Sequence, residues 1–473
     1  MAITPVIIPR SRHHVSRASI SRNAVRVLYR LKEAGYRSYL VGGGVRDLLL
    51  GREPKDFDIA TDATPRDVKK LFRNCRLIGR RFRLAHIHFH DEIIEVATFR
   101  SSAMEAPEPE EAAQEVLPVP EALPAPAEGA AEAVAPRPRP PRMLKTEDGM
   151  ILRDNVFGTP EDDAVRRDFT VNALFYNIAD FSVIDYIGGI DDLQRGLIRL
   201  IGDPVTRFTE DPVRMVRAVR FTAMLGFTIE EQTERALIEV RDKVALASPS
   251  RLYEETLKLF LLGAGEKTYQ LLRKYGLFGV LFPHLNDWLG AESDGFPHTR
   301  IGKALEWVDA CIQAGREVPP TVLFSLILGQ YLGEQAGKHQ AGGASALPAL
   351  ELAVAGLLSE QSKRVLIPRK IGIAIRDILW NQHRFEKRQG RHPLYFLRRP
   401  GFFEAFEYLR FTSEMSGERR DLVAWWQDFI KSHPPGSDGE QAEGTSGRPP
   451  DRTPRKRRRK RRPRSKPETK TTT

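Results

Sequence analysis

Two aspartates, Asp56 and Asp58, lie one residue apart in the segment GREPKDFDIATDATP, residues 51–65. In a β-strand, side chains at positions i and i+2 project from the same face, so we expect these two carboxylates to lie together. Two such charges repel each other unless a cation neutralises them, and oxygen ligands of this kind suit Mg²⁺. Because the pattern is short, an ordinary solvated strand edge is the alternative explanation for these two residues taken alone.

A glycine-rich segment, LVGGGVRD at residues 40–47, precedes the two acids. It predicts a strand, a glycine turn and the start of a helix, where backbone N–H groups at Gly43 and Gly44 can approach a phosphate. Arg46 would add a guanidinium group, which binds phosphates through two hydrogen bonds. A plain turn between a strand and a helix is the alternative. Together with the paired acids, the segment predicts a site for nucleotidyl transfer.

A third segment, EDPVRMVRAVRF at residues 210–221, combines acids and arginines at helical spacing. Asp211 and Arg214 are three residues apart, so on one helix they share a face, and Arg217 continues it. An aspartate accepts and an arginine donates hydrogen bonds, which matches the Watson–Crick edge of adenine and also that of cytosine. Guanine and uracil present the reverse order and would leave buried groups unpaired. The pair therefore predicts ATP or CTP as the substrate, with an exposed helix salt bridge as the alternative.

These motifs, together with RRDFTVNAL at residues 166–174, resemble the class II nucleotidyltransferases of the polymerase-beta type. That group comprises the bacterial CCA-adding enzymes and the bacterial poly(A) polymerases, and the resemblance covers roughly residues 20–430 apart from 101–142. It implies that Asp56 and Asp58 bind catalytic Mg²⁺ and that Asp168 is a further active-site acid.

Three more candidate site residues are indicated by the same resemblance and by their places in the sequence. Glu95, on a predicted strand, is the second choice for a third carboxylate, and a surface acid facing away from the metals is its alternative. Arg166 and Arg167 are expected to contact the triphosphate or the RNA primer. Alternatively, these two arginines pair with the acids at 161–163 on the same helix.

The segment LIGRRFRLAHI, residues 77–87, resembles the signature that separates bacterial poly(A) polymerases from CCA-adding enzymes. We expect Arg80, Arg81 and Arg83 to orient ATP or to hold the RNA 3′ end. Beside them, His86, His88 and His90 alternate onto one strand face. Three imidazoles can bind zinc, but the family has no such site, so a polar strand face is the favoured interpretation of the histidines.

The motifs together predict a template-independent adenylyltransferase that adds AMP from ATP to RNA 3′ ends with the help of Mg²⁺. A CCA-adding enzyme that repairs tRNA ends shares the metal and base-reading motifs and is the nearest alternative. A second alternative is an RNA-binding protein on a scaffold that has lost catalysis. The resemblance also implies cooperation with the RNA-decay machinery.

Short helices and strands alternate over the first hundred residues and must position these motifs. Their periodicity predicts helices at 21–34, 45–51 and 64–74, and strands at 36–42, 56–61, 84–90 and 92–100. Thr64 followed by Pro65 is a typical helix start. Residues 101–142 are rich in Ala, Pro and Glu and cannot bury enough apolar surface to fold, so we expect them to be disordered.

The spacing of apolar residues changes to the helical period near residue 190 and keeps it to about residue 432, with a Gly/Gln/Ala loop expected near 335–347. The fold class is therefore α+β, with a small mixed α/β head followed by an all-helical neck, body and tail. The expected parts are an N-terminal extension at 1–22, a nucleotidyltransferase head at 23–187, a helical neck at 188–285, a helical C-terminal arm at 286–432 and a disordered basic tail at 433–473.

The net charge of +11 over 473 residues is concentrated in the tail. From Asp451 onward there are twelve Lys and Arg against two acids, which leaves the rest of the chain with a net charge of only +1. We expect Arg457, Arg458 and Arg459 to bind RNA phosphates without sequence preference, and this binding should weaken steeply with salt. A solubilising tail without a partner, or a localisation signal, are the alternatives.

Other bulk features exclude several classes of protein. No apolar run approaches the ~20 residues that span a bilayer, so no membrane is expected as a partner. The segment MAITPVIIPRSRHHVSR lacks the apolar core of a signal peptide, which indicates a protein that is not exported. The two cysteines, Cys75 and Cys311, form no metal or disulfide pattern, which favours the reducing cytoplasm.

Overall fold

The computed structural model describes residues 4–79, 83–101, 157–290 and 300–434, together with the backbone of 144–145 and 151–153. The chain divides into two compact units, Met1–Arg420 and Asp421–Thr473. Arg80, Arg81 and the tail arginines 457–459 lie outside the described residues, as does the expected insertion beyond Ser101. The predictions for those residues therefore stay predictions.

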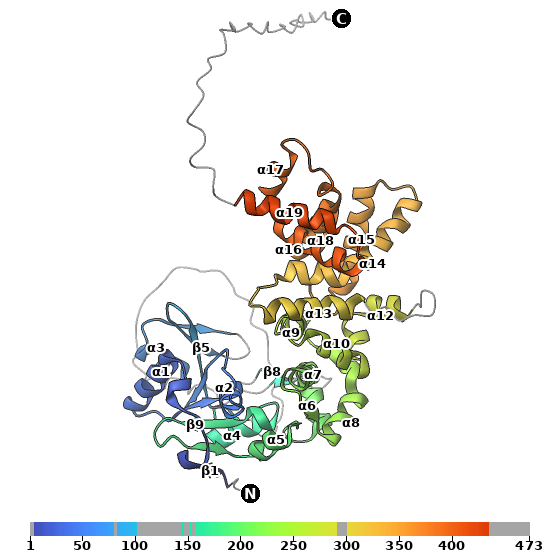
Figure 1. Cartoon of the computed structure of the whole chain (residues 1–473). Helices are drawn as coiled ribbons and strands as arrows, with labels where there is room; N and C mark the ends of the chain where they lie inside the picture. The colour runs from blue at the N-terminus through green and yellow to red at the C-terminus, as the bar shows by residue number, and fades with distance from the viewer. Residues whose placement is uncertain are drawn as a thin grey trace, which may run out of the picture. The chain divides into compact units, whose positions relative to one another are not determined.

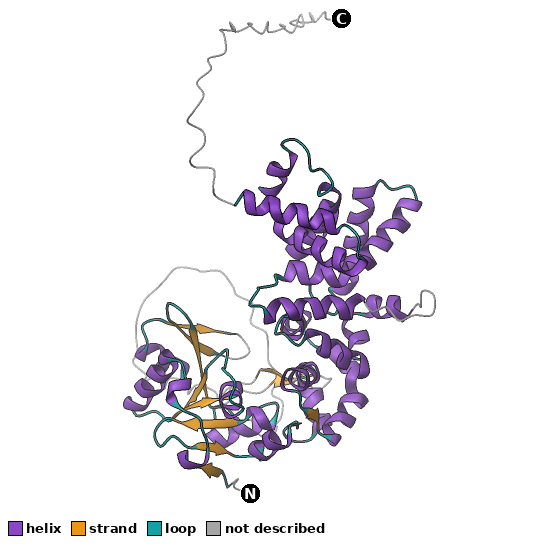
Figure 2. Ribbon diagram, in the orientation of Figure 1, coloured by secondary structure: helices purple, strands orange, loops and turns teal. Residues whose placement is uncertain are grey.

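The head is built on one eight-stranded mixed sheet with helices packed on it (Figures 1 and 2). The strand order is β1-β10-β9-β2-β3-β6-β5-β4. The strands are β1 (Val6–Ile8), β2 (Ser38–Val41), β3 (Asp58–Thr61), β4 (Cys75–Ile78), β5 (Leu84–His88), β6 (Ile93–Thr98), β9 (Leu174–Asn177) and β10 (Val183–Asp185). A separate two-stranded pair consists of β7 (Leu144–Lys145) and β8 (Ile151–Arg153). The expected α+β class with a mixed head is confirmed.

Two edge strands were not expected from the sequence. Strand β1 pairs antiparallel with β10, so part of the segment expected to be an N-terminal extension belongs to the head sheet. Strand β4 forms the opposite edge and pairs antiparallel with β5. Between them, β2 and β3 are antiparallel, whereas β3 and β6 run parallel.

One face of the sheet is covered by α1 (Arg22–Glu33) and α3 (Pro65–Leu71). The Ser21 side chain caps α1 by accepting hydrogen bonds from the backbone N–H groups of Asn23 and Ala24, and Thr64 caps α3 in the same way. Ser38 of β2 donates a hydrogen bond to the carbonyl of Leu28 in α1, which fixes this face of β2 toward the helix. The predicted helix starts are confirmed.

The other face holds an apolar cluster that includes Val41, Ala60, Phe175 and Ala164 of helix α4 (Pro160–Arg166). Thr159 begins α4 with a capping box in which Thr159 and Asp162 bond each other's backbone. Because Asp58 is two residues before Ala60 and pairs with Val41, it projects from this same face. The sheet therefore directs Asp58 toward the side that carries α4.

The neck contains helices with one short parallel strand pair, β11 (Leu197–Ile198) and β12 (Thr228–Ile229), between them. The segment at 210–221, expected to lie on one helix, is broken: α6 (Pro204–Glu210) ends at Asp211, and α7 (Val213–Leu225) starts after Pro212. Proline fits a helix start but not the interior, which explains the break. The other helices around α6 and α7 are α5 (Gly189–Arg195), α8 (Glu231–Val240), α9 (Pro249–Phe260), α10 (Gly265–Lys274), α11 (Leu277–Leu281) and α12 (Pro283–Gly290).

The arm is helical, as predicted (Figure 2). Its helices are α13 (Arg300–Gln313), α14 (Pro320–Ala341), α15 (Ala346–Gln361), α16 (Arg369–Trp380), α17 (His392–Leu397), α18 (Phe402–Ser416) and α19 (Arg420–Ser432). The loop expected at 335–347 is wrong for most of its length, because α14 continues to Ala341 through Gly337, which a helix tolerates. Within the described residues, none of these helices is long and apolar enough to cross a membrane.

Candidate active site

The first strand residue of β3 is Asp58, and Asp56 lies just before the strand in an exposed turn. The expectation that both acids alternate on one regular strand is therefore wrong in detail. The backbone carbonyl of Asp56 lies 3.3 Å from the position that a Cβ on Gly44 would occupy, so the two segments touch. The acids consequently meet the glycine turn where β3 begins.

Gly42 makes this contact between the turn and the acids possible. Its backbone angles, φ 75° and ψ −141°, lie in a region that side chains exclude. A Cβ on Gly42 would also lie 3.2 Å from Nη1 of Arg167 and 3.9 Å from Oδ2 of Asp58. The missing side chain thus leaves room for a guanidinium and a carboxylate beside the turn.

Asp58 lies in a strongly perturbed electrostatic environment. Burial, and then the negative charges of Glu95 and Asp56, raise its pKa to about 6, although Arg167 and Arg217 act in the opposite direction. Glu95 is the direct neighbour of Asp58 in the parallel pair β3–β6, so their side chains share a face. Three carboxylates therefore act on one position of the sheet, and their mutual repulsion is incompletely compensated by protein cations.

Glu95 is engaged on its other side by His86, whose Nε2 lies 3.2 Å from Oε1 of Glu95. The His86 and His88 rings are 6.4 Å apart, and His90 is exposed. Among the residues that the structure describes, no three His, Cys, Asp or Glu side chains form a metal-binding group, and the histidine face belongs to none. The candidate metal ligands are thus Asp56 and Asp58, with Glu95 beside them.

Asp168 is bound by the neck and does not stand free beside the other acids. Its Oδ2 accepts a hydrogen bond from Nε of Arg217 at 2.7 Å and forms an ion pair with Nη2 at 2.5 Å, and its Oδ1 accepts from the backbone N–H of Phe169. Although burial raises the pKa of Asp168, the charge and hydrogen bonds of Arg217 outweigh it and lower the pKa to about 2. Asp168 and Arg217 therefore clamp the head to α7.

Asn172 connects this clamp to the glycine turn, and the sequence analysis did not single it out. Its Nδ2 donates to Oδ1 of Asp168 at 3.2 Å, and its Oδ1 accepts from Nη1 of Arg46 at 2.6 Å. Arg46 is buried and also pairs with Asp47. The expectation that Arg46 faces a phosphate is therefore wrong in this structure, because its guanidinium is turned inward to support the turn.

A single aromatic ring, that of Phe221 on α7, receives three guanidinium groups. Those of Arg46, Arg217 and Arg220 lie 5.1, 5.3 and 4.4 Å from its centroid. Glu255 on α9 lies between two of them, 3.7 Å from Arg217 and 3.4 Å from Arg220. The joint between head and neck is thus a buried network of charges around one ring.

Each member of the predicted base-reading pair has another hydrogen-bond partner. Asp211 lies at the break between α6 and α7 and accepts two hydrogen bonds of 3.0 Å from the guanidinium of Arg251 on α9. Arg214 donates to the carbonyl of Arg207 at 2.8 Å. Burial, followed by the nearby charge of Arg207, lowers the pKa of Arg214 to about 10. Arg251, which the sequence analysis missed, therefore fixes the orientation of the Asp211 carboxylate.

The remaining predicted residues are placed as follows. Arg167 donates to Asp163 at 2.9 Å on the same helical turn, so the alternative pairing is confirmed, but its guanidinium also lies beside Gly42. The Arg166 side chain is half-buried, and the Arg166 carbonyl accepts a hydrogen bond from Arg207. Arg83 is exposed, and its carbonyl accepts from Arg100 at 3.3 Å.

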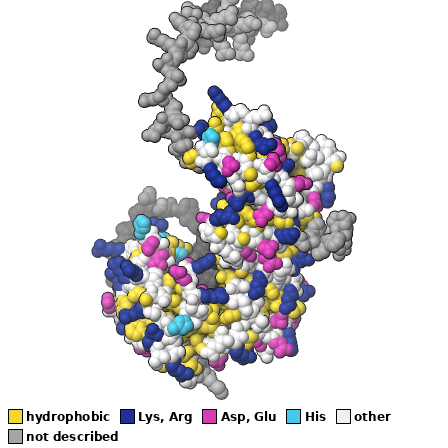
Figure 3. Space-filling model, viewed as in Figure 1, with side chains coloured by type: hydrophobic (Ala, Val, Ile, Leu, Met, Phe, Trp, Pro, Cys, Tyr) yellow, Lys and Arg dark blue, Asp and Glu magenta, His cyan; other side chains and the backbone are white. Residues whose placement is uncertain are grey.

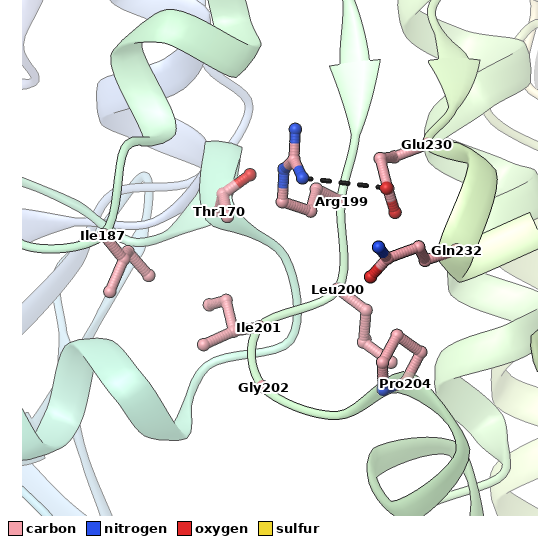
Figure 4. Close-up of a pocket in the computed structure, with 9 residues that line it drawn as sticks. All are labelled: Thr170, Ile187, Arg199, Leu200, Ile201, Gly202, Pro204, Glu230 and Gln232. Atoms are coloured by element: carbon pink, nitrogen blue, oxygen red, sulfur yellow. Dashed lines mark ion pairs between the residues drawn. The ribbon is translucent and has the colours of Figure 1, made fainter.

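A pocket of about 290 Å³ lies apart from these acids, between the head residue Thr170 and the neck (Figure 4). Arg199 and Glu230 point toward each other across it, with Nη1 and Oε1 3.7 Å apart. Arg199 is also bound to Asp192 at 2.9 Å. The charged side chains that line the pocket are thus already paired, and we do not assign the reaction to this pocket.

Comparison with known families matches three parts of the chain. Residues 38–199 match the family described as poly A polymerase head domain, and residues 226–289 match a probable RNA and SrmB-binding site of polymerase A. Residues 342–465 match the polymerase A arginine-rich C-terminus. The matched ranges follow the chain order that the motifs predicted.

Curated relatives span nearly the full chain. Poly(A) polymerase I of Salmonella typhi is 43% identical over 436 residues, covering 92% of this chain and 87% of that protein. Poly(A) polymerase I of Haemophilus influenzae is 40% identical over 441 residues, covering 92% and 89%. The CCA-adding enzyme of Lactobacillus gasseri is 34% identical over 254 residues, which is 54% of each chain.

Solved structures share the fold. The Bacillus stearothermophilus CCA-adding enzyme in complex with CTP has a TM-score of 0.55 and 24% identity, covering 86% of this chain and 82% of that one. The Thermotoga maritima CCA-adding enzyme complexed with tRNA has a TM-score of 0.51 and 20% identity, covering 91% and 87%. With relatives above 40% identity along almost its whole length, the chain belongs to the bacterial poly(A) polymerase family of nucleotidyltransferases.

Proposed function

We propose that the protein extends RNA 3′ ends with AMP from ATP, without a template, at the junction of β3 and the Gly42 turn. The observation that carries the proposal is the meeting of Asp58, Arg167 and the side-chain-free Gly42 at one point of the sheet. Carboxylates and a guanidinium beside a turn without side chains suit a triphosphate with its cation. The poly(A) polymerase I relatives supply the choice of RNA and ATP.

The residues present fit a divalent cation. Asp58 has a pKa of about 6 because burial, Glu95 and Asp56 disfavour its negative charge. We assign Mg²⁺ to Asp56 and Asp58, with Glu95 as the neighbouring acid. When bound there, the cation supplies neutralisation of phosphate charge and activation of the attacking hydroxyl.

The chain's own side chains perform the positioning. Arg167 is held by Asp163 with its guanidinium beside Gly42, where it meets phosphate oxygens. The RNA 3′-hydroxyl attacks the α-phosphorus of ATP, the new P–O bond forms, and the bond to the leaving pyrophosphate breaks. Asp58 is directed toward the same point. These side chains therefore contribute to catalysis mainly by orienting the reactants and by stabilising the charge on the phosphates.

Selection of the base is assigned to Asp211 and Arg214. Arg251 holds the Asp211 carboxylate through two hydrogen bonds, but each carboxylate oxygen keeps capacity to accept from a base amino group. Arg214 must exchange its bond to the Arg207 carbonyl for the ring nitrogen of the base. ATP and CTP both satisfy this pair, so the choice between them rests on the surrounding pocket.

One assay tests the function against its alternatives. Purified protein is incubated with a generic RNA, or with tRNA lacking its end, and with ATP or CTP. We expect a long ladder of added AMP on the generic RNA. Addition of CMP–CMP–AMP to tRNA alone would identify a CCA-adding enzyme, and no product on either RNA would identify a non-catalytic RNA-binding protein. Action in the cytoplasm beside RNA-decay nucleases is a further part of the proposal.

A further inference from the structure

The segment from Lys387 to Phe403, which includes α17, carries exposed aromatic rings among cations that the proposed reaction does not use. It contains five Lys and Arg and no acid. Tyr395 is 63% exposed, more than any other large hydrophobic side chain in the described residues, and Phe403 is 46% exposed. Aromatic rings elsewhere in the arm, such as Phe385 and Phe396, are buried. The segment thus combines exposed rings with positive charge, which suits a ligand with both apolar faces and negative charge.

Exposed arginines lie four residues before and four residues after Tyr395, at Arg391 and Arg399. The backbone N–H of Tyr395 donates to the carbonyl of Arg391 at 3.2 Å, so these two residues are neighbours on the first turn of α17. Arg399 follows the end of α17, and its backbone N–H donates to the carbonyl of Phe396 at 3.0 Å. The helix therefore has an exposed arginine at its start and another just after its end.

Buried aromatic rings anchor the helix that carries Tyr395. Phe396, next to Tyr395 but buried, lies with its ring centroid 4.9 Å from Phe385 and 5.1 Å from Phe402. These rings fix α17 on α18, so the core is complete without Tyr395. The exposure of Tyr395 is thus unrelated to packing of the arm.

We propose that this aromatic–arginine surface, made of Arg391, Tyr395, Arg398, Arg399 and Phe403, binds single-stranded RNA upstream of the 3′ end. One base stacks on Tyr395, and the flanking cations contact phosphates. Charge complementarity favours RNA over a protein partner, because the surface alternates positive charge and π-faces as a nucleic-acid strand alternates phosphate and base. Figure 3 shows hydrophobic and basic side chains side by side over the part where Figure 1 places α17.

The inference deepens the proposed function, on which it rests, by separating two modes of RNA binding. The tail from Asp451 onward contains no aromatic residue and can contribute charge alone. Tyr395 adds contacts to bases, which high salt weakens far less than phosphate contacts. The aromatic–arginine surface should therefore dominate binding once salt has screened the tail.

The test is fluorescence anisotropy with the full chain and labelled single-stranded RNA at about 0.5 M salt, without ATP. We expect Tyr395→Ala to weaken binding about tenfold and Tyr395→Phe to retain it, since the ring supplies the stacking. The same RNA without bases should bind both variants and the wild type equally. Leu352→Ala, which removes a 53%-exposed side chain from α15, is the matched control.

Charge is tested in the same way. Arg391→Ala with Arg399→Ala should reduce affinity more than Arg369→Ala with Lys370→Ala, which removes two exposed cations elsewhere on the arm. Wild-type affinity in Tyr395→Ala, or an equal loss on RNA without bases, would overturn the assignment. Because AMP incorporation is measured separately, failure of this surface and failure of the proposed reaction give different results.

Discussion

At the scale of single residues, the candidate site depends on Asp58, whose ionised form is disfavoured by its surroundings. Asp58 is partly buried next to Glu95 and Asp56, so its pKa of about 6 exceeds the value near 3.9 expected in the unfolded chain. A raised pKa means that the ionised form destabilises the fold at neutral pH. A cation bound at the site would reduce the repulsion among these carboxylates.

Asp58→Asn should stabilise the metal-free protein at pH 7.5 by roughly 1–3 kcal/mol, because the folded state no longer holds this charge. The stabilising effect of the protonated wild-type acid is fully present below about pH 4 and is lost as pH rises through about 6, so the variant's advantage should vanish at low pH. Thermal unfolding in EDTA across pH measures it. Glu53→Gln, at an exposed position in the segment before β3, is the control, and equal stability of Asp58→Asn and wild type at pH 7.5 contradicts the prediction.

Asp58→Ala should abolish AMP incorporation while leaving RNA affinity within about twofold, since the acid belongs to the reaction and not to the RNA surface. Product on denaturing gels and anisotropy with the same RNA measure the two effects. Retained turnover in this variant would refute the metal assignment.

At the scale of elements, the contacts between α7 and the head decide how the active residues meet. Asp168, Arg217 and Glu255 join the RRD segment, α7 and α9, and Asn172 extends the connection to the glycine turn. The sequence placed Asp168 and Arg217 in separate roles. The structure shows that they are partners in one ion pair.

Removing one side of this pair should be costly, because it leaves the other charge buried without its partner. We expect Asp168→Ala and Arg217→Ala each to reduce the free energy of unfolding by about 3 kcal/mol. The double variant should lose much less than the sum. Urea unfolding of the three proteins measures the coupling, and additive losses would show that the pair does not act as a clamp. The contribution of Asp168 is present above about pH 4 and is lost as pH falls through about 2.

The break between α6 and α7 makes its own prediction about nucleotide choice. Arg214→Ala should reduce the preference for ATP over GTP and UTP by about tenfold, because a missing donor no longer rejects the wrong base. Competition assays with four nucleotides measure the preference. Arg235→Ala, in an exposed pair with Glu231, should leave it unchanged; an unaltered preference in Arg214→Ala would remove the base-reading role.

How much the sequence could predict differs between local and distant features. The helix starts near residue 21 and at Thr64 could be predicted because a cap is a contact between near neighbours, and both were confirmed. The family and the α+β class followed from ordered motifs. In contrast, the partners of Arg46 and Asp211 come from Asn172 and Arg251, far along the chain, and no local pattern announces such pairs.

Edges of the sheet show the same limit. Strand β1 lies in the segment expected to be an extension. Only three of its residues pair, and Val6 and Ile7 are exposed, so no alternating pattern of buried residues marks it in the sequence. The loop expected at 335–347 failed for a different reason: glycine lowers helix propensity, but packing of α14 against α15 and α16 overrides it.

At the scale of the whole molecule, charge is divided between a nearly neutral body and a basic tail. In our proposal, the body binds RNA bases through the aromatic–arginine surface. The tail offers attraction that depends only on phosphates. Salt should therefore change RNA retention and nucleotide choice independently.

Deleting residues 451–473 should weaken RNA binding at low salt and flatten its salt dependence, since each phosphate contact contributes a slope of about 0.7 on a logarithmic plot. AMP incorporation from saturating RNA should stay near the wild-type rate. Anisotropy at several salt concentrations gives the slope. If the slope and the number of AMP residues added per binding event are both unchanged, the basic segment is not an RNA tether.

The place of β9 in the sheet has a consequence for how the head is made. Strand β9 fills the centre between β2 and β10, yet it is translated after β3, β6 and α4. While the ribosome is still producing the preceding segment, β2 presents an open edge, which is a template for wrong pairing. The edge of β2 is paired only when β9 has emerged. A pause in translation before Leu174 should therefore prolong the time during which this edge can aggregate.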